Sequence, residues 1–198
     1  MDKAEAAEDI KLIREVMETS ARYTNFSGIS GIIAGTLALL GCGATYWVTL
    51  ALPGVLLIRS YVIIWVLVLA ISIFQDFALA QRKARRRGED YFTPATAQVY
   101  KAVLPGIFVA VVLSIRALTL RELDAIPALW CLGYGAAICA AGRFSVREAR
   151  IFGAVQLISG AIGLFLFATP PESLYFLAVT FGVYHILFGL ILTRKYGW

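Results

Sequence analysis

The sequence YVIIWVLVLAISIFQDFAL covers residues 61–79 and contains a single charged side chain, Asp76. A helix needs about 20 predominantly apolar residues to cross the hydrocarbon core of a bilayer. A helix on the surface of a soluble protein has a polar face opposite its apolar one, and this stretch has no such face. The stretch therefore predicts a transmembrane helix.

Five further stretches have the same character, so the sequence predicts an all-α, polytopic bundle of six transmembrane helices within residues 26–198. The chain is 60% hydrophobic and 16% charged, whereas soluble domains are about 45–50% apolar and about 25% charged. Two prolines fit helix starts: we expect Pro105 in the first turn of the third span and Pro127 at the start of the fourth. The five further spans are expected at residues 28–50, 102–120, 126–142, 151–168 and 174–193.

The distribution of Lys and Arg predicts the orientation of the bundle, because cytoplasmic loops are enriched in these residues. The segments on one side hold only Arg59, Arg116 and Arg121. This bias, with an even number of spans, places both termini in the cytoplasm. It also explains the net charge of +5 without nucleic acid as a partner. The residues of the richer side are Lys3, Lys11, Arg14, Arg22, Arg82, Lys83, Arg85, Arg86, Arg87, Lys101, Arg143, Arg147, Arg150, Arg194 and Lys195.

The segment before the first span, residues 1–25, predicts a cytoplasmic amphipathic helix. Within residues 4–23, Ile10, Ile13, Met17 and Ala21 recur at helical spacing, Leu12 and Val16 widen this apolar stripe, and charged residues occupy much of the remaining surface. Such a helix lies on the membrane surface or packs under the bundle, or it docks another protein. Its mildly acidic polar face favours protein over anionic lipid.

Glycine pairs seven residues apart occur in four of the predicted spans. Seven residues turn a helix by about 700°, which returns each pair to nearly the same face. Helices inside lipid associate by close packing at small residues, so these faces are the expected helix–helix contacts. The pairs are Gly28 and Gly35, Gly135 and Gly142, Gly153 and Gly160, and Gly182 and Gly189.

Ionisable residues inside a membrane mark functional sites by default. His185, the single histidine, shares the face of Gly182 and Gly189 and should point into the bundle. Tyr134, Gln156 and Ser159 are candidate hydrogen-bond partners from other spans. The set is either structural, with a neutral buried imidazole, or it relays protons or binds a ligand.

Asp76 lies near the cytoplasmic end of the second span. At that depth its carboxylate is expected to reach lipid headgroups or to pair with Lys101 or Arg147, although an ion-coupling role is also open. The basic run just beyond it predicts a topology determinant that binds acidic headgroups, each base near an anionic surface being worth about 1 kcal/mol. The run consists of Arg82, Lys83, Arg85, Arg86 and Arg87.

Metal and cofactor sites are not expected. The three cysteines, Cys42, Cys131 and Cys139, are far apart in apolar stretches and form no CxxC pattern. A six-coordinate haem with two histidine ligands cannot form with one histidine.

Two stretches resemble a group of uncharacterised bacterial integral membrane proteins: EDIKLIREVMETSARYTNFSGISGIIAG at residues 8–35 and LWCLGYGAAICAAGRFSVR at residues 129–147. The resemblance implies an inner-membrane location and no known activity. By size and glycine-rich spans alone, the chain is also similar to the six-span acid-resistance membrane proteins of the HdeD type.

The sequence favours a non-enzymatic protein, because it shows no nucleophile–base pair or metal cluster. The leading hypothesis is an accessory or partner-binding subunit. The alternative is a small transporter or channel, possibly homodimeric, that uses His185 and Asp76.

The orientation predicts that residue 172 is accessible from outside and residue 86 from the cytoplasm. Single cysteines at these two positions, in a chain without Cys42, Cys131 and Cys139, should react with an impermeant thiol reagent from opposite sides. Labelling of position 172 from the cytoplasmic side alone would contradict six spans with internal termini.

Overall fold

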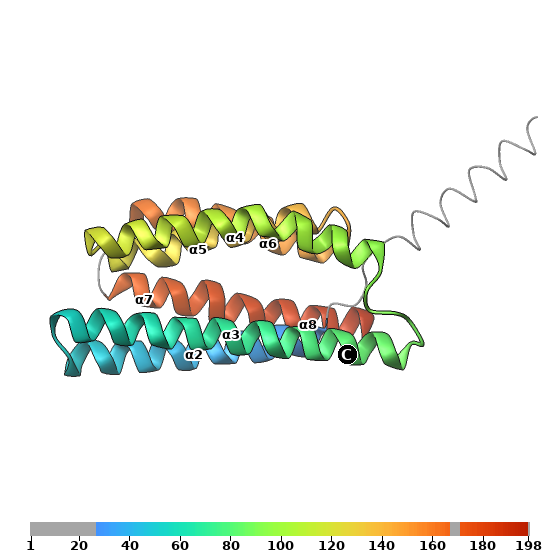
Figure 1. The fold of residues 1–198 in the computed structure, drawn as a ribbon, viewed down its shortest axis with the longest axis horizontal. Coiled ribbons are helices and arrows are strands. Elements are labelled where there is room, and N and C mark those ends of the chain that lie inside the picture. The colour runs from blue at the N-terminus through green and yellow to red at the C-terminus, as the bar shows by residue number, and fades with distance from the viewer. Residues whose placement is uncertain (1–26, 167–170, 198) are drawn as a thin grey trace, which may run out of the picture.

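A computed structural model describes residues 27–166 and 171–197, and within these ranges the chain is entirely helical (Figure 1). Six helical segments are long and apolar enough to cross a membrane, which confirms the predicted fold class. The predicted amphipathic helix at residues 4–23 lies outside the described ranges. The elements are α2 (Gly28–Ala51), α3 (Gly54–Arg86), α4 (Pro94–Leu120), η1 (Leu123–Ala125), α5 (Ile126–Ala141), α6 (Arg147–Leu166), α7 (Glu172–Leu177), η2 (Ala178–Val183) and α8 (Tyr184–Tyr196).

Two helices extend well beyond the apolar stretches that predicted them. Helix α3 continues through the basic run to Arg86. Helix α4 begins at Pro94, where the Thr93 hydroxyl accepts a hydrogen bond from the Thr96 backbone N–H at 3.2 Å. The expectation that Pro105 lies in a first turn is therefore wrong, and this proline lies inside α4. Hydropathy marks the part of a helix that lies in hydrocarbon, whereas capping residues mark where the helix begins.

The helices form two groups of three that lie side by side (Figure 1). In the first group α5 packs between α4 and α6, and in the second α2 packs between α3 and the last span. The last span is continuous through α7, η2 and α8. It also contacts α5 and α6, so it connects the two groups. We call α4–α5–α6 the central unit and α2–α3–α7–η2–α8 the terminal unit.

Glycines carry the contact between α2 and the last span. A Cβ on Gly189 would lie 2.4 Å from the Gly28 carbonyl oxygen, and one on Gly35 would lie 2.5 Å from the Gly182 carbonyl oxygen. A Cβ on Gly182 would meet the Leu39 side chain at 2.4 Å. These backbones are too close for any side chain, which is the packing that membrane helices use in place of a hydrophobic driving force.

The central unit uses glycine in the same way. A Cβ on Gly135 would lie 2.4 Å from the Leu157 nitrogen, and one on Gly153 would lie 2.3 Å from the Cys139 nitrogen. A Cβ on Gly142 would lie 2.6 Å from the Arg150 nitrogen, and one on Gly160 would lie 2.6 Å from the Leu132 nitrogen. All four glycines therefore lie at the contact between α5 and α6. The contact between α4 and α5 also depends on glycine, since a Cβ on Gly106 would lie 2.5 Å from the Gly133 carbonyl oxygen. The seven-residue spacing did not reveal this last pair.

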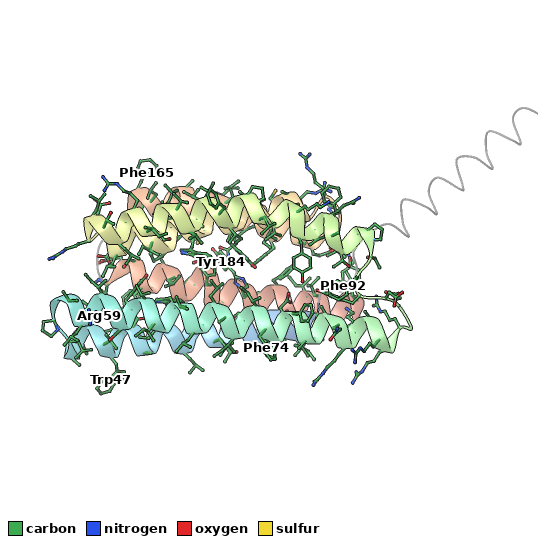
Figure 2. The ribbon with its side chains drawn as sticks, in the orientation of Figure 1. Trp47, Arg59, Phe74, Phe92, Phe165 and Tyr184 are labelled. Carbon is green, nitrogen blue, oxygen red and sulfur yellow. The ribbon has the colours of Figure 1, made fainter. Side chains whose placement is uncertain are left out.

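Lys and Arg residues gather at one end of the bundle. At this end the start of α2 packs against the end of α8. The Lys83 ammonium donates to the Gly197 carbonyl at 3.3 Å. Glu148, at the start of α6, forms an ion pair with Lys195. Arg59 lies near the opposite end (Figure 2). Lys83 is only 5% exposed, so it faces the bundle and not the headgroups that the sequence suggested for it. We call the end with Lys83 and Lys195 the basic end.

Replacing Gly189 or Gly160 with leucine should destabilise the protein in detergent by about 1–3 kcal/mol, the usual cost of bulk added to a packed core. Gly43→Leu is the matched control, because nothing lies within 4 Å of a Cβ built at that position. Thermal unfolding should show a lower midpoint for the first two variants and no loss for the control. Three equal midpoints would show that the glycine contacts do not limit stability.

Candidate intramembrane polar site

His185 and Tyr134 meet where the terminal and central units touch. His185 lies at the start of α8, is 8% exposed, and its Nε2 is 3.1 Å from the Tyr134 hydroxyl on α5. Of the three partners considered from the sequence, Tyr134 is the one within hydrogen-bond distance. A hydrogen bond to a group on another span is the expected way to satisfy a polar side chain in hydrocarbon.

Aromatic rings surround the imidazole. The Phe181 ring stacks on it with centroids 5.4 Å apart, and the Phe152 ring meets it edge-on at 4.8 Å. Tyr134 lies over it at 5.4 Å. Phe152 comes from α6, so three elements of the two units contribute to this enclosure. A charged imidazolium is costly in such surroundings, because little water is present to solvate it.

Gln156 binds the turn that precedes His185. It is fully buried on α6, and its side-chain amide donates to the Thr180 carbonyl at 2.8 Å. Thr180 belongs to η2, a π-helix, in which the wider turn alters the usual backbone hydrogen bonding. The Thr180 hydroxyl in turn donates to the Phe176 carbonyl at 2.8 Å. Gln156 therefore holds the π-helical turn against the central unit and forms no hydrogen bond with His185.

Asp76 differs from its expected role at the membrane boundary. Its carboxylate accepts a hydrogen bond from the Ser30 hydroxyl of α2, and neither Lys101 nor Arg147 pairs with it. Gln75 donates to the Ser30 carbonyl at 3.1 Å and so reinforces the same contact. Asp76 is also within electrostatic reach of the Tyr134 hydroxyl. Of the four sequence candidates, His185 and Tyr134 share a hydrogen bond, Asp76 reaches Tyr134 by its charge alone, and Gln156 binds the neighbouring turn.

Two polar contacts lie toward the two ends of the boundary between the units. At the end opposite the basic end, the Ser173 hydroxyl donates to the Asp124 carboxylate at 2.6 Å. At the basic end, Glu148 accepts from the Lys195 ammonium and, at 2.7 Å, from the Tyr196 hydroxyl. Sequence reasoning missed both contacts. The scarcity of acidic residues after residue 25 is the signal that could have singled out Asp124 and Glu148.

Several polar atoms of this region have no hydrogen-bond partner among the described residues. They are the His185 Nδ1 and the side-chain carbonyl oxygens of Gln75 and Gln156, all of them buried. A neutral imidazole with Nδ1 protonated accepts the Tyr134 hydrogen at Nε2, and the other tautomer donates to the Tyr134 oxygen. The hydrogen bond between Tyr134 and His185 can therefore run in either direction.

The described residues contain no group of three His, Cys, Asp or Glu side chains that could hold a metal ion. Cys42, Cys131 and Cys139 are free thiols. The chemistry that these residues offer is hydrogen bonding and proton exchange by carboxyl, phenol and imidazole groups.

Comparison with known proteins assigns no relative, because no protein family, no curated protein and no solved structure matches the chain. The two resemblances noted in the sequence therefore transfer no residue role and no activity. The site has to be interpreted from its own geometry.

The contact between His185 and Tyr134 predicts a small, specific stability effect. Tyr134→Phe should destabilise the protein by about 0.6 kcal/mol, the average for interhelical hydrogen bonds in membranes. His185→Gln should cost a similar amount, since glutamine retains a hydrogen-bonding group. His185→Leu should cost more, because it leaves the Tyr134 hydroxyl unpaired.

Tyr184→Phe is the matched control. Tyr184 is the neighbouring residue, points into the space between the two units (Figure 2) and makes no side-chain hydrogen bond to a described residue. Equilibrium unfolding in mixed micelles measures these variants and the Tyr134→Phe, His185→Leu double variant. Strictly additive effects of Tyr134→Phe and His185→Leu in the double variant would contradict a direct interaction.

Proposed function

We propose that the protein is a small, non-enzymatic membrane carrier in which Asp76, Tyr134 and His185 form an intramembrane proton-binding site. The observation that carries the proposal is the contact between His185 and Tyr134, which joins the two units inside the membrane. A carboxylate from a third helix, α3, lies within electrostatic reach of it. Proton relays in transporters are built from such ionisable groups, which are otherwise rare inside membranes.

Protonation has a structural consequence at this position. An imidazolium between the rings of Phe152 and Phe181 loses most of its solvation, so uptake of a proton favours any arrangement that gives the ring a counter-charge or water. Asp76 is an acidic group whose charge reaches Tyr134, the hydrogen-bond partner of His185. Proton binding would thereby change the balance between two arrangements of the units.

The contacts between the units suit such a change. Four polar contacts across the boundary connect the last span with Asp124, Tyr134, Glu148 and Gln156 of the central unit and the turn before it. Polar contacts of this kind in membrane proteins are individually weak. Helix α3 packs against α2 and has no extensive contact with the central unit. The glycine contacts inside each unit are close, so relative movement of two rigid units is the expected motion.

We further propose that the basic end faces the cytoplasm of a bacterial inner membrane. The Lys and Arg residues at the ends of α3 and α8 support this orientation, which follows the positive-inside rule.

An accessory role is the second candidate, in which the protein binds a different membrane subunit. It is favoured by α3, whose most apolar 18-residue window contains no buried residue. Purification in a mild detergent separates the two proposals. A stoichiometric second protein supports the accessory role, and a chain that purifies alone or as a homo-oligomer supports the carrier.

The carrier proposal predicts proton movement that depends on the site. Liposomes containing the protein and an internal pH indicator are given a pH gradient and tested with monovalent cations, amines and carboxylates. Proton flux should exceed that of the Asp76→Asn, His185→Gln double variant with at least one class of solute. The control, Tyr184→Phe, should behave as wild type. Equal fluxes for wild type and double variant with every class would refute the proposal.

A further inference from the structure

A hollow of about 250 Å³ lies at the basic end, where α3 ends and the chain turns into α4. It is independent of the polar site described above. Its lining combines charged, polar and aromatic side chains. They are Gln81, Arg85, Glu89, Asp90, Tyr91 and Phe92.

The loop that forms the hollow is held in place by its own contacts. Tyr91 is buried against Ala80 and Ala84, and its hydroxyl is 2.6 Å from that of Tyr100 on α4. The Thr96 hydroxyl donates to the Tyr91 carbonyl at 2.6 Å. Gly88 takes a left-handed backbone conformation, with φ of 69°, which lets the chain reverse direction directly after α3. The hollow is therefore a formed part of the fold.

The hollow is lined by charged side chains of both signs that form no ion pair with one another. The side chains of Arg85, Glu89 and Asp90 are exposed, and none of them forms a hydrogen bond or an ion pair with another described residue. A hollow with one guanidinium and two carboxylates is complementary to a ligand that carries an anion and a cation close together. A purely anionic ligand would be repelled by Glu89 and Asp90.

Phe92 shows where such a ligand would lie. Its ring is 76% exposed, beside the charged lining and at the end of the spans (Figure 2). The apolar stretch of α3 ends at Leu79, and Arg85 follows it by six residues, about 9 Å along the helix, which is just outside the hydrocarbon core. The hollow is thus at headgroup depth, with an apolar surface directed toward acyl chains.

We propose that this hollow binds the headgroup of a zwitterionic aminophospholipid, phosphatidylethanolamine. Arg85 pairs with the phosphate, and the carboxylates of Glu89 and Asp90 accept hydrogen bonds from the primary ammonium. Phe92 contacts the beginning of the acyl chains. Charge-assisted hydrogen bonds require N–H donors on the ligand, which ethanolamine has and choline lacks. The site selects phosphatidylethanolamine over phosphatidylcholine for this reason, and over phosphatidylglycerol because of the two carboxylates.

Native mass spectrometry of the full chain in detergent micelles tests the proposal, with phosphatidylethanolamine, phosphatidylcholine or phosphatidylglycerol of identical acyl chains added in turn. The wild type should retain phosphatidylethanolamine best. Arg85→Ala should weaken its binding about fivefold, the effect expected for one base beside a phosphate. Arg59→Ala, at the opposite end of α3, is the matched control and should leave binding unchanged.

The Glu89→Gln, Asp90→Asn double variant changes exposed loop residues only, so it keeps the test valid if Arg85→Ala fails to fold. It should lose affinity for phosphatidylethanolamine and gain affinity for phosphatidylglycerol. Unchanged binding of phosphatidylethanolamine in this variant would overturn the proposal, as would a wild type that prefers either of the other two lipids. Free phosphoethanolamine should compete poorly, and displacement of the lipid at equal concentration would show that the site takes a soluble compound instead.

Discussion

The last span packs against both halves of the bundle, and it does so by two different physical means. Toward α2 it offers Gly182 and Gly189, where backbones approach so closely that no side chain fits. Toward the central unit it offers hydrogen-bonding groups, among them the Thr180 carbonyl and the His185 imidazole. Inside lipid the apolar side chains of two helices gain little by leaving the solvent, so close packing and hydrogen bonding have to supply the specificity.

This division of contacts determines which parts of the molecule behave as rigid bodies. Close backbone packing is lost all at once when two helices separate, whereas a hydrogen bond can be exchanged for another. The α2–α8 and α5–α6 pairs are therefore the firm parts, and the boundary beside Gln156 and Tyr134 is where we expect relative movement to cost least. The polar groups lie at the boundary where movement is easiest, which is where a carrier needs them.

The sequence predicted the spans and the glycine faces because both depend on local patterns. A transmembrane run of apolar residues has to match the thickness of the bilayer. Two glycines seven residues apart lie on nearly the same face of a helix. It did not predict that Asp76 meets Ser30, because that contact depends on how α2 and α3 are rotated against each other, which no spacing within one helix reveals. The contact between Gly106 and Gly133 was missed for the same reason, because the two glycines lie on different helices and no spacing within one helix relates them. The continuation of α3 through Arg86 was missed because hydropathy ends where the hydrocarbon ends.

The π-helical turn Ala178–Val183 gives the last span one residue more than a regular α-helix needs for the same rise. Removing one residue from this turn would restore α-helical geometry. Ser173 before the turn and Leu192 after it would still lie on the same faces of the span. In evolutionary terms the turn is equivalent to a single-codon insertion that the helix has absorbed at one place. Relatives that lack this codon would have a regular helix here, in which the Thr180 carbonyl is directed along the helix axis to its own intrahelical bond and is a poorer acceptor for a glutamine at position 156. The length of this span and the identity of residue 156 should therefore vary together among descendants of a common ancestor.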